Sequence, residues 1–326
     1  MLIKDKIYGD QIIENQLILD IVNTPEMQRL KGINQYGTYA FVSEMFNTTR
    51  FEHCLGVYFL LKKFNASFEE QIAGLIHDIP HTVFSHVVDY VYGDAEKQEY
   101  HENHHSRIIK NSKISYLLKK NNIDAEPILN ENNFPLLEKE IPDLCADRLD
   151  YFMRDTFTLK KSTAKDIERY LNSFIIYNNE FVTNDLQIAK EIANKFMDTN
   201  LSFWGIGFQA GSFQLLADIF KIGLKNDIIT EDDFFTTDNE IIEKLKQSGN
   251  KQILRDLSLM ERDKIVLGTK EDHDFFTKSK VRFIDPKILH KENIKRLSEL
   301  DNDFKQRIKD FKKKIEQGYY IKILRN

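Results

Sequence analysis

The sequence predicts a mainly α-helical protein with a small α+β extension at its C-terminal end. Most of the chain carries apolar residues at three- and four-residue spacing behind capping residues, which is typical of amphipathic helices. Apolar alternation is confined to the first 22 residues and the last third. The 326 residues exceed one average domain, so we expect a first domain over residues 1–240 and a C-terminal region over 241–326.

Local signals give the order of the elements in the first domain. A short strand or hairpin is expected near residues 8–9. Thr24 followed by Pro25 predicts the start of a helix, because Thr caps helices and Pro favours the first helical position. We expect this helix to end at Gly37.

The later helices have similar start signals. Ser67 and Glu70 form a capping-box pattern before the apolar sequence IAGLIHD. Thr230 and Thr237 each precede an acidic residue at the same spacing. Further helices are predicted over residues 102–121, 144–159 and 185–225, the last with a break near residues 205–211.

The C-terminal region has a different pattern. Residues 280–284 are predicted to form a strand with alternating side chains. Residues 287–317 are predicted to form one long charged helix, because apolar residues from Ile294 to Ile315 make a single seam. The final GYYIKIL segment is predicted to be a strand.

Composition excludes several classes of protein. Lys and Arg number 46 and Asp and Glu number 51, which gives a net charge of −5 and does not favour nucleic acid as a partner. No apolar run is long enough to span a membrane, and the first residues lack a secretory signal pattern. The two cysteines, Cys54 and Cys145, have no CxxC spacing. We therefore expect a cytoplasmic protein without a membrane partner.

Histidines are concentrated in one part of the chain. Of the nine, seven lie between residues 53 and 105: His53, His77, His81, His86, His101, His104 and His105. His77 and Asp78 end an apolar helix, and Pro80 supplies the break that lets adjacent side chains approach one ion. A set of His53, His77, Asp78 and a later carboxylate suits Mn, Fe, Zn, Ni or Co better than Mg or Ca.

The sequence LCADRLDYFMRD offers the later carboxylate. Asp147, Tyr151 and Asp155 are spaced four residues apart and share one helix face. The alternative is a solvated face with an Asp150–Arg154 ion pair.

Four motifs in order resemble the HD-domain metal-dependent phosphohydrolases. They are NTTRFEHCLGV, AGLIHDIPHTVFSH, YHENHHSRII and CADRLDYFMRD. Within that superfamily they are most similar to the SAM-and-HD-domain deoxynucleoside triphosphate triphosphohydrolases and their bacterial relatives. The resemblance covers about residues 25–160 and implies a helical core around a metal.

The resemblance also implies roles for individual residues. It makes His53, His77, Asp78 and Asp147 the metal ligands. The implied catalytic residues are His101, Glu102, His81 and His86, with Glu102 holding the His101 imidazole protonated. The implied substrate-binding residues are Gln35, Tyr36, Arg50, Tyr151 and Asp155. Mg²⁺ is a further cation to consider, arriving with the substrate phosphate.

Two features depart from the family pattern. Tyr36 replaces the leucine of a sugar-reading Gln-Leu-Gly motif, where its larger ring would exclude a 2′-hydroxyl or stack on a different substrate. Where the family has Arg, His and Tyr to hold the triphosphate, an ungapped alignment places Asn200, Trp204 and Phe208. A triphosphate needs cations, so these positions weaken the triphosphate assignment.

The function expected from the resemblance is metal-dependent hydrolysis of a deoxynucleoside triphosphate to deoxynucleoside and triphosphate by a metal-activated water. One alternative keeps the chemistry but acts on nucleoside monophosphates, cyclic nucleotides or nucleic-acid ends. Another is a regulatory or binding module that retains the metal with little turnover. We expect a homodimer, because the apolar seam and the aromatic-rich helix offer interfaces.

Overall fold

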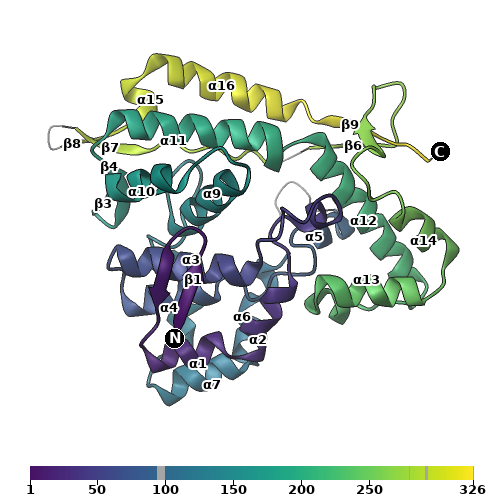
Figure 1. The fold of residues 1–326 in the computed structure, drawn as a ribbon, viewed down its shortest axis with the longest axis horizontal. Helices are drawn as coiled ribbons and strands as arrows, with labels where there is room; N and C mark the ends of the chain where they lie inside the picture. Colours follow the sequence, from purple (N-terminus) through teal and green to yellow (C-terminus); the bar gives the residue numbers. More distant parts are fainter. Residues whose placement is uncertain (94–99, 279, 291–292, 326) are drawn as a thin grey trace.

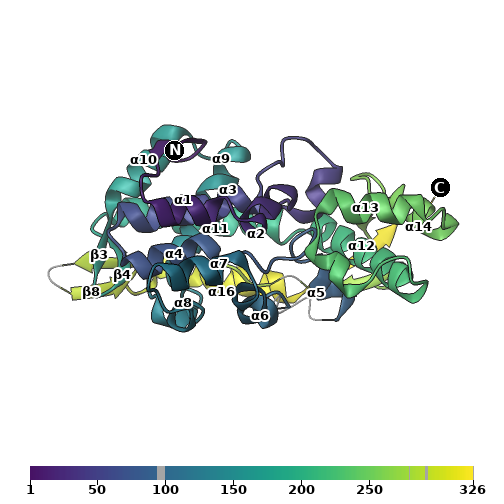
Figure 2. The ribbon, with the colours of Figure 1, turned by 90° about the horizontal axis from the view of Figure 1, so that it is seen from below.

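Helices dominate the computed structural model, which describes residues 1–93, 100–278, 280–290 and 293–325. Three small sheets accompany the helices of this described part. The predicted fold class, mainly α with a small sheet-containing C-terminal region, is confirmed (Figures 1 and 2). No helix among the described residues is both long and apolar enough to cross a bilayer.

The N-terminal half is a bundle of short helices behind a hairpin. The hairpin predicted near residues 8–9 is present as β1 (Leu2–Asp5) paired with β2 (Gly9–Ile12). The helices that follow are α1 (Gln16–Val22), α2 (Pro25–Arg29), α3 (Arg50–Lys63), α4 (Phe68–Ile76), α5 (Val87–Val91), α6 (His105–Lys110), α7 (Lys113–Lys120), α8 (Ala125–Ile128), α9 (Ala146–Thr158) and α10 (Ala164–Ser173). Helices α3 and α4 pack together at the centre of one large apolar core.

Two predicted helices are shorter than expected. Thr24 caps α2 as predicted, but α2 ends at Arg29, and Gly37 begins the 3-10 turn η2 (Gly37–Phe41). Gly37 has φ +58, a left-handed backbone conformation that favours glycine. The helix predicted over residues 102–121 is divided, because the Ser112 side chain accepts a hydrogen bond from the Ile114 N–H and so starts α7 as a separate helix.

The capping box predicted at the start of α4 is only half present. Ser67 accepts the N–H of Glu70, as expected. The Glu70 carboxylate instead accepts the backbone N–H groups of Leu136 (2.6 Å) and Leu137 (3.1 Å). The carbonyls of these two leucines accept the N–H groups of Ala146 and Asp147, which begin α9. Glu70 therefore holds the loop that starts α9, a helix with no side-chain cap of its own.

The second half contains two long helices and a smaller group. The break predicted near residues 205–211 follows η5 (Asn200–Trp204), a π-helical turn that separates α11 (Leu186–Thr199) from α12 (Gly207–Lys225). Thr230 begins the 3-10 turn η6 (Glu231–Phe235), and Thr237 begins α13 (Asp238–Gln247); each residue completes a capping box. Helix α14 (Lys251–Leu257) follows and packs on α12.

The sheets join the C-terminal region to the first domain. Strands β3 (Phe174–Tyr177), β4 (Glu180–Thr183), β7 (Lys287–His290) and β8 (Asn293–Arg296) form one sheet in that order. Strand β4 pairs with β7 in parallel, so chain from both predicted regions shares this sheet. Strands β5 (Ile265–Leu267), β9 (Tyr319–Ile323) and β6 (Phe275–Thr277) form another, against α12, and include the predicted final strand.

Two C-terminal predictions are wrong. Residues 280–284 form no strand; they cross between the two sheets, and Phe283 and Ile284 are buried in the core. Residues 287–317 are not one helix but β7, β8, α15 (Leu297–Leu300) and α16 (Asn302–Glu316). Asp301 separates the two helices because it accepts the Phe304 N–H and caps α16. Figure 1 shows α16 lying along α11.

Replacement of Glu70 by Ala should destabilise the protein by about 2 kcal/mol or more, because the buried N–H groups of Leu136 and Leu137 would lose their acceptor. Chemical denaturation should detect this loss. Glu69→Ala is the matched control, since Glu69 is the exposed neighbour on the same helix. Equal stabilities of the two variants would contradict a structural role for Glu70.

Candidate active site

Four predicted ligands come together from three helices. His53 lies in the first turns of α3, His77 and Asp78 follow α4, and Asp147 begins α9. His53 Nε2 and Asp147 Oδ1 are 2.8 Å apart. His77 Nε2 lies 3.6 Å from Asp147 Oδ1 and 3.6 Å from Asp78 Oδ1. The four side chains therefore point at one buried position.

The donor atoms at this position fit a divalent transition metal. Ligand atoms of His53, His77 and Asp147 all lie within 4.8 Å of one another. His77 Nδ1 donates to the Gly74 carbonyl (2.8 Å), which directs Nε2 inwards, where this buried atom has no hydrogen-bond partner among the described residues. Two imidazoles with two carboxylates form a set that suits Mn, Fe, Zn, Ni or Co.

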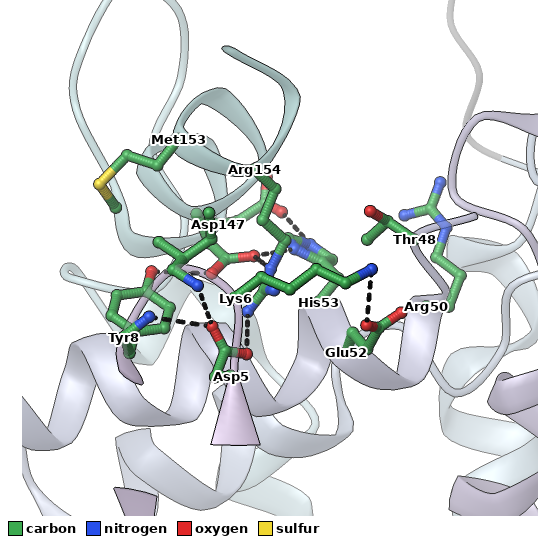
Figure 3. A network of polar contacts seen from close by, with 12 residues as sticks. Asp5, Lys6, Tyr8, Thr48, Arg50, Glu52, His53, Asp147, Met153 and Arg154 are labelled. Atoms are coloured by element: carbon green, nitrogen blue, oxygen red, sulfur yellow. Dashed lines mark hydrogen bonds and ion pairs between the residues drawn. The ribbon is translucent and has the colours of Figure 1, made fainter. Parts of the chain in front are cut away.

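A buried carboxylate holds His53 from behind. His53 Nδ1 lies 2.7 Å from Asp150 Oδ2, and the Asp150 carboxylate also accepts bonds from Arg154 Nε (2.7 Å) and the Tyr8 hydroxyl (2.7 Å). Arg154 Nη2 in turn contacts Asp5 of β1 at 2.8 Å (Figure 3). The alternative of a solvated Asp150–Arg154 pair is wrong, since these side chains are 0% and 2% exposed.

Close helix packing makes this arrangement possible. A Cβ atom on Gly56 of α3 would overlap the Asp150 carboxylate and the Arg154 guanidinium. Glycine at this position therefore lets α9 approach α3 until Asp150 reaches His53. Carboxylate–imidazole pairs of this kind fix the ring and raise the basicity of a metal-binding nitrogen.

The charges of the candidate metal ligands are balanced by neighbouring side chains. Burial alone would raise the pKa of Asp78, but the Arg50 guanidinium at 2.7 Å, with His77 and His53, holds it below its usual range. Burial opposes the charge on His53, yet its bonds to Asp147 and Asp150 raise the pKa of its imidazole. A metal ion that binds His53 must therefore displace a proton.

Three predicted catalytic histidines form a cluster beside the ligands. The rings of His81 and His101 stack at 3.9 Å, and His86 lies 5.0 Å from His81. Burial and the neighbouring His86 lower the pKa of His101 to about 3. The role of Glu102 in holding this imidazole protonated stays a prediction, since the lowered pKa describes the protein without substrate. Glu102 lies next to it on η3 (Glu102–His104) and is exposed.

Two hollows open on the ligand cluster. The inner hollow has a volume of about 140 Å³, and the outer hollow has a volume of about 790 Å³. All the predicted substrate-binding residues line the inner hollow: Gln35, Tyr36, Arg50, Tyr151 and Asp155. The outer hollow is lined on one side by His77, Asp78, His101 and Glu102. Asp147 and Tyr151 are among the residues that line both hollows.

Aromatic residues form the far wall of the inner hollow. Tyr36 is buried in a cluster with Phe203, and its hydroxyl lies 3.0 Å from Thr48 Oγ1. Trp204 Nε1 donates to Asp155 Oδ2 at 2.5 Å. Burial raises the pKa of Asp155 to about 7 despite this hydrogen bond, so the carboxyl is close to half-protonated at neutral pH.

Sequence reasoning missed several residues at the site. Asp150 and Arg154 belong to the DRLDYFMRD motif, but the sequence suggested for them only the alternative of an ion pair on a solvated face. Lys280 and Arg282 line both hollows, although they follow the ligand motifs by more than 120 residues. In the sequence, the only local sign of a role for Lys280 and Arg282 is that these two basic residues lie two positions apart in a basic segment.

Comparisons with known proteins agree with the geometry. Residues 50–155 match the family described as HD domain. The uncharacterized protein YdhJ of Bacillus subtilis is 32% identical over 326 residues, which cover 100% of both chains. The metal-dependent phosphohydrolase cns2 of Cordyceps militaris is 28% identical over 300 residues, 88% of this chain and 85% of cns2.

Two further similarities are more distant. The deoxynucleoside triphosphate triphosphohydrolase SAMHD1 homolog of Dictyostelium discoideum is 26% identical over 231 residues, which span 60% of this chain but 43% of that protein. A crystal structure of a hypothetical protein from Aquifex aeolicus superposes with a TM-score of 0.73 at 20% identity, covering 100% of this chain and 96% of that one. The second similarity establishes the fold alone.

Replacement of Asp150 by Asn should weaken divalent-metal binding roughly 10- to 100-fold, because His53 would lose its charged partner. Competition with a chromophoric chelator would measure the affinity, and circular dichroism would verify folding. Asp10→Asn, an exposed change on β2, is the control. Wild-type affinity in a folded Asp150→Asn protein would refute this positioning role.

Trp204 is the single tryptophan, and its indole N–H bonds to Asp155. Because the pKa of Asp155 is raised to about 7, its carboxyl is mostly neutral below that pH and mostly charged above it. Tryptophan emission of the chelator-treated protein should therefore titrate with a midpoint near 7. In Asp155→Asn the titration should disappear; its persistence there would assign it to another group.

Proposed function

This chain belongs to the HD-domain superfamily of metal-dependent phosphohydrolases, and we propose that it hydrolyses nucleotides, with a deoxynucleoside triphosphate as its substrate. The proposed products are the deoxynucleoside and triphosphate. The main support is the buried His–Asp ligand set, which faces a hollow with one aromatic wall and one cationic wall. Similarity to the Dictyostelium protein named as a deoxynucleoside triphosphate triphosphohydrolase favours this substrate.

His53, His77, Asp78 and Asp147 would hold the metal. When bound, a divalent transition metal lowers the pKa of water towards neutrality and withdraws charge from a phosphoryl oxygen. Arg50 already donates to Asp78, and its guanidinium also lines the inner hollow. In that position it can bind a phosphate oxygen with a charge-assisted hydrogen bond.

The histidine cluster would supply the proton for the leaving group. Hydrolysis at the α-phosphate breaks the bond between phosphorus and the sugar oxygen, and that oxygen must gain a proton. His101 is neutral in the protein without substrate, but the charge of a phosphate nearby would raise its pKa. We assign the acid to His101, with His81 and His86 beside it near the phosphates and Glu102 next in sequence.

The sugar and base would occupy the inner hollow. Tyr151 and Asp155 lie on the α9 face that also carries Asp147. Gln35 and Tyr36 line the same hollow, and the Gln35 side-chain oxygen is buried without a hydrogen-bond partner among the described residues. A sugar hydroxyl would satisfy this oxygen. The buried Tyr36 ring limits the space on the same side of the hollow and would exclude a 2′-hydroxyl.

The test is a product assay by mass spectrometry. Purified protein with Mn²⁺ or Fe²⁺ would be incubated with pooled deoxyribonucleoside and ribonucleoside tri- and monophosphates. We expect deoxynucleoside and intact triphosphate from the deoxy pool. Asp78→Ala should abolish turnover, because it removes a ligand and the partner of Arg50.

Other products would redirect the proposal. Release of inorganic phosphate from nucleoside monophosphates would identify the protein as a nucleotidase and not a triphosphohydrolase. Turnover that persists in Asp78→Ala would come from a contaminant. A metal-loaded wild-type protein without any product would contradict hydrolysis of these nucleotides and favour a binding module.

A further inference from the structure

The positions expected to hold a triphosphate carry no charge in this protein. Asn200 is fully buried, and neither polar atom of its side chain has a hydrogen-bond partner among the described residues. Trp204 is bonded to Asp155, and the ring of Phe208 packs 5.5 Å from that of Tyr39. Of these three positions only Trp204 lines the inner hollow, so none of them brings a cation to a polyphosphate chain there.

The cations come from the segment between β6 and β7. Lys280 and Arg282 are half-buried, and both line the inner and the outer hollow. Among the described residues, the two hollows share only these side chains and those of Asp147 and Tyr151. Lys280 and Arg282 therefore stand at the junction where a substrate that extends past the metal ligands would place its phosphates.

The segment is held firmly by its C-terminal side. Phe283 and Ile284 are buried directly after Arg282. The Asp285 N–H donates to the Pro142 carbonyl (3.0 Å). The Asp285 carboxylate accepts bonds from the N–H (2.9 Å) and the hydroxyl (2.5 Å) of Ser298. Because these contacts fix the backbone, the two cations have a defined place beside the ligands.

Electrostatic effects on nearby groups agree with this placement. Burial, followed by Arg50, Arg282 and Lys280, lowers the pKa of His86 well below its usual value. Arg50 also lines the inner hollow and already contacts Asp78. Lys280 and Arg282 thus add two cationic side chains to the hollow beside the Arg50–Asp78 ion pair.

We propose that Lys280 and Arg282 bind the phosphates beyond the scissile one, so that the substrate is a nucleoside polyphosphate rather than a monophosphate. This inference rests on the proposed phosphohydrolase function. Arg282 offers several donors to phosphate oxygens, and Lys280 adds a point charge. The C-terminal region then completes the active site in place of the positions at Asn200, Trp204 and Phe208.

The test compares Lys280→Ala, Arg282→Ala and the double variant in the full-length protein. Calorimetry with inorganic tripolyphosphate, with Mn²⁺ in excess, measures binding without turnover. Each single change should weaken binding roughly 10- to 100-fold, and the double change more. Arg282→Lys should recover part of the loss. Lys278→Ala, an exposed lysine in the same segment, is the matched control.

A kinetic comparison distinguishes a specific loss of phosphate binding from a general loss of activity in the variants. In the Lys280 and Arg282 variants, kcat/KM for a deoxynucleoside triphosphate should fall at least tenfold more than kcat/KM for a small phosphodiester, bis(p-nitrophenyl) phosphate. Equal losses for both substrates, or wild-type tripolyphosphate affinity in the double variant, would overturn the inference. If the wild-type protein hydrolyses neither substrate, the proposed function fails, while the calorimetry still decides whether these residues bind polyphosphate.

Discussion

The buried carboxylate of Asp150 is the constraint on which the rest of the site depends. It accepts hydrogen bonds from the N-terminal hairpin through Tyr8, from its own helix through Arg154, and from α3 through His53. A buried ion pair adds little net stability, but removal of one partner leaves an uncompensated charge that costs about 3–5 kcal/mol. These bonds therefore fix geometry more than they stabilise the fold: they set the orientation of a candidate ligand.

A second polar contact positions the opposite side of the site. Glu70 in α4 binds the loop whose carbonyls accept the first N–H groups of α9, and Asp147 lies in that first turn. Helix α4 thus controls both the ligands that follow it and the start of the helix that carries Asp147. Apolar packing brings α3, α4 and α9 together, whereas directional hydrogen bonds define where their donor atoms point.

The sequence predicted those parts of the fold and site that depend on local signals. Capping residues such as Thr24 and Thr237 begin helices where expected, and the clustered histidines and Asp147 converge. Long-range pairing was not predictable from one sequence. The apolar residues from Ile294 to Ile315 fit one long helix as well as the observed hairpin and two helices. The pairing of β7 with β4 is a long-range contact that this local pattern does not specify. The proximity of Lys280 to the ligands has the same origin.

The local arrangement of charge, not the net charge of −5, determines which ligand the site favours. Arg154 balances the charge of Asp150, and Arg50 with the histidines balances Asp78. Burial keeps Asp155 close to half-protonated at neutral pH. The acidic groups are thus largely neutralised by partners within the protein, and a bound divalent cation would add positive charge. An acidic protein therefore presents a cationic hollow, and an anionic ester can approach carboxylates that would otherwise repel it.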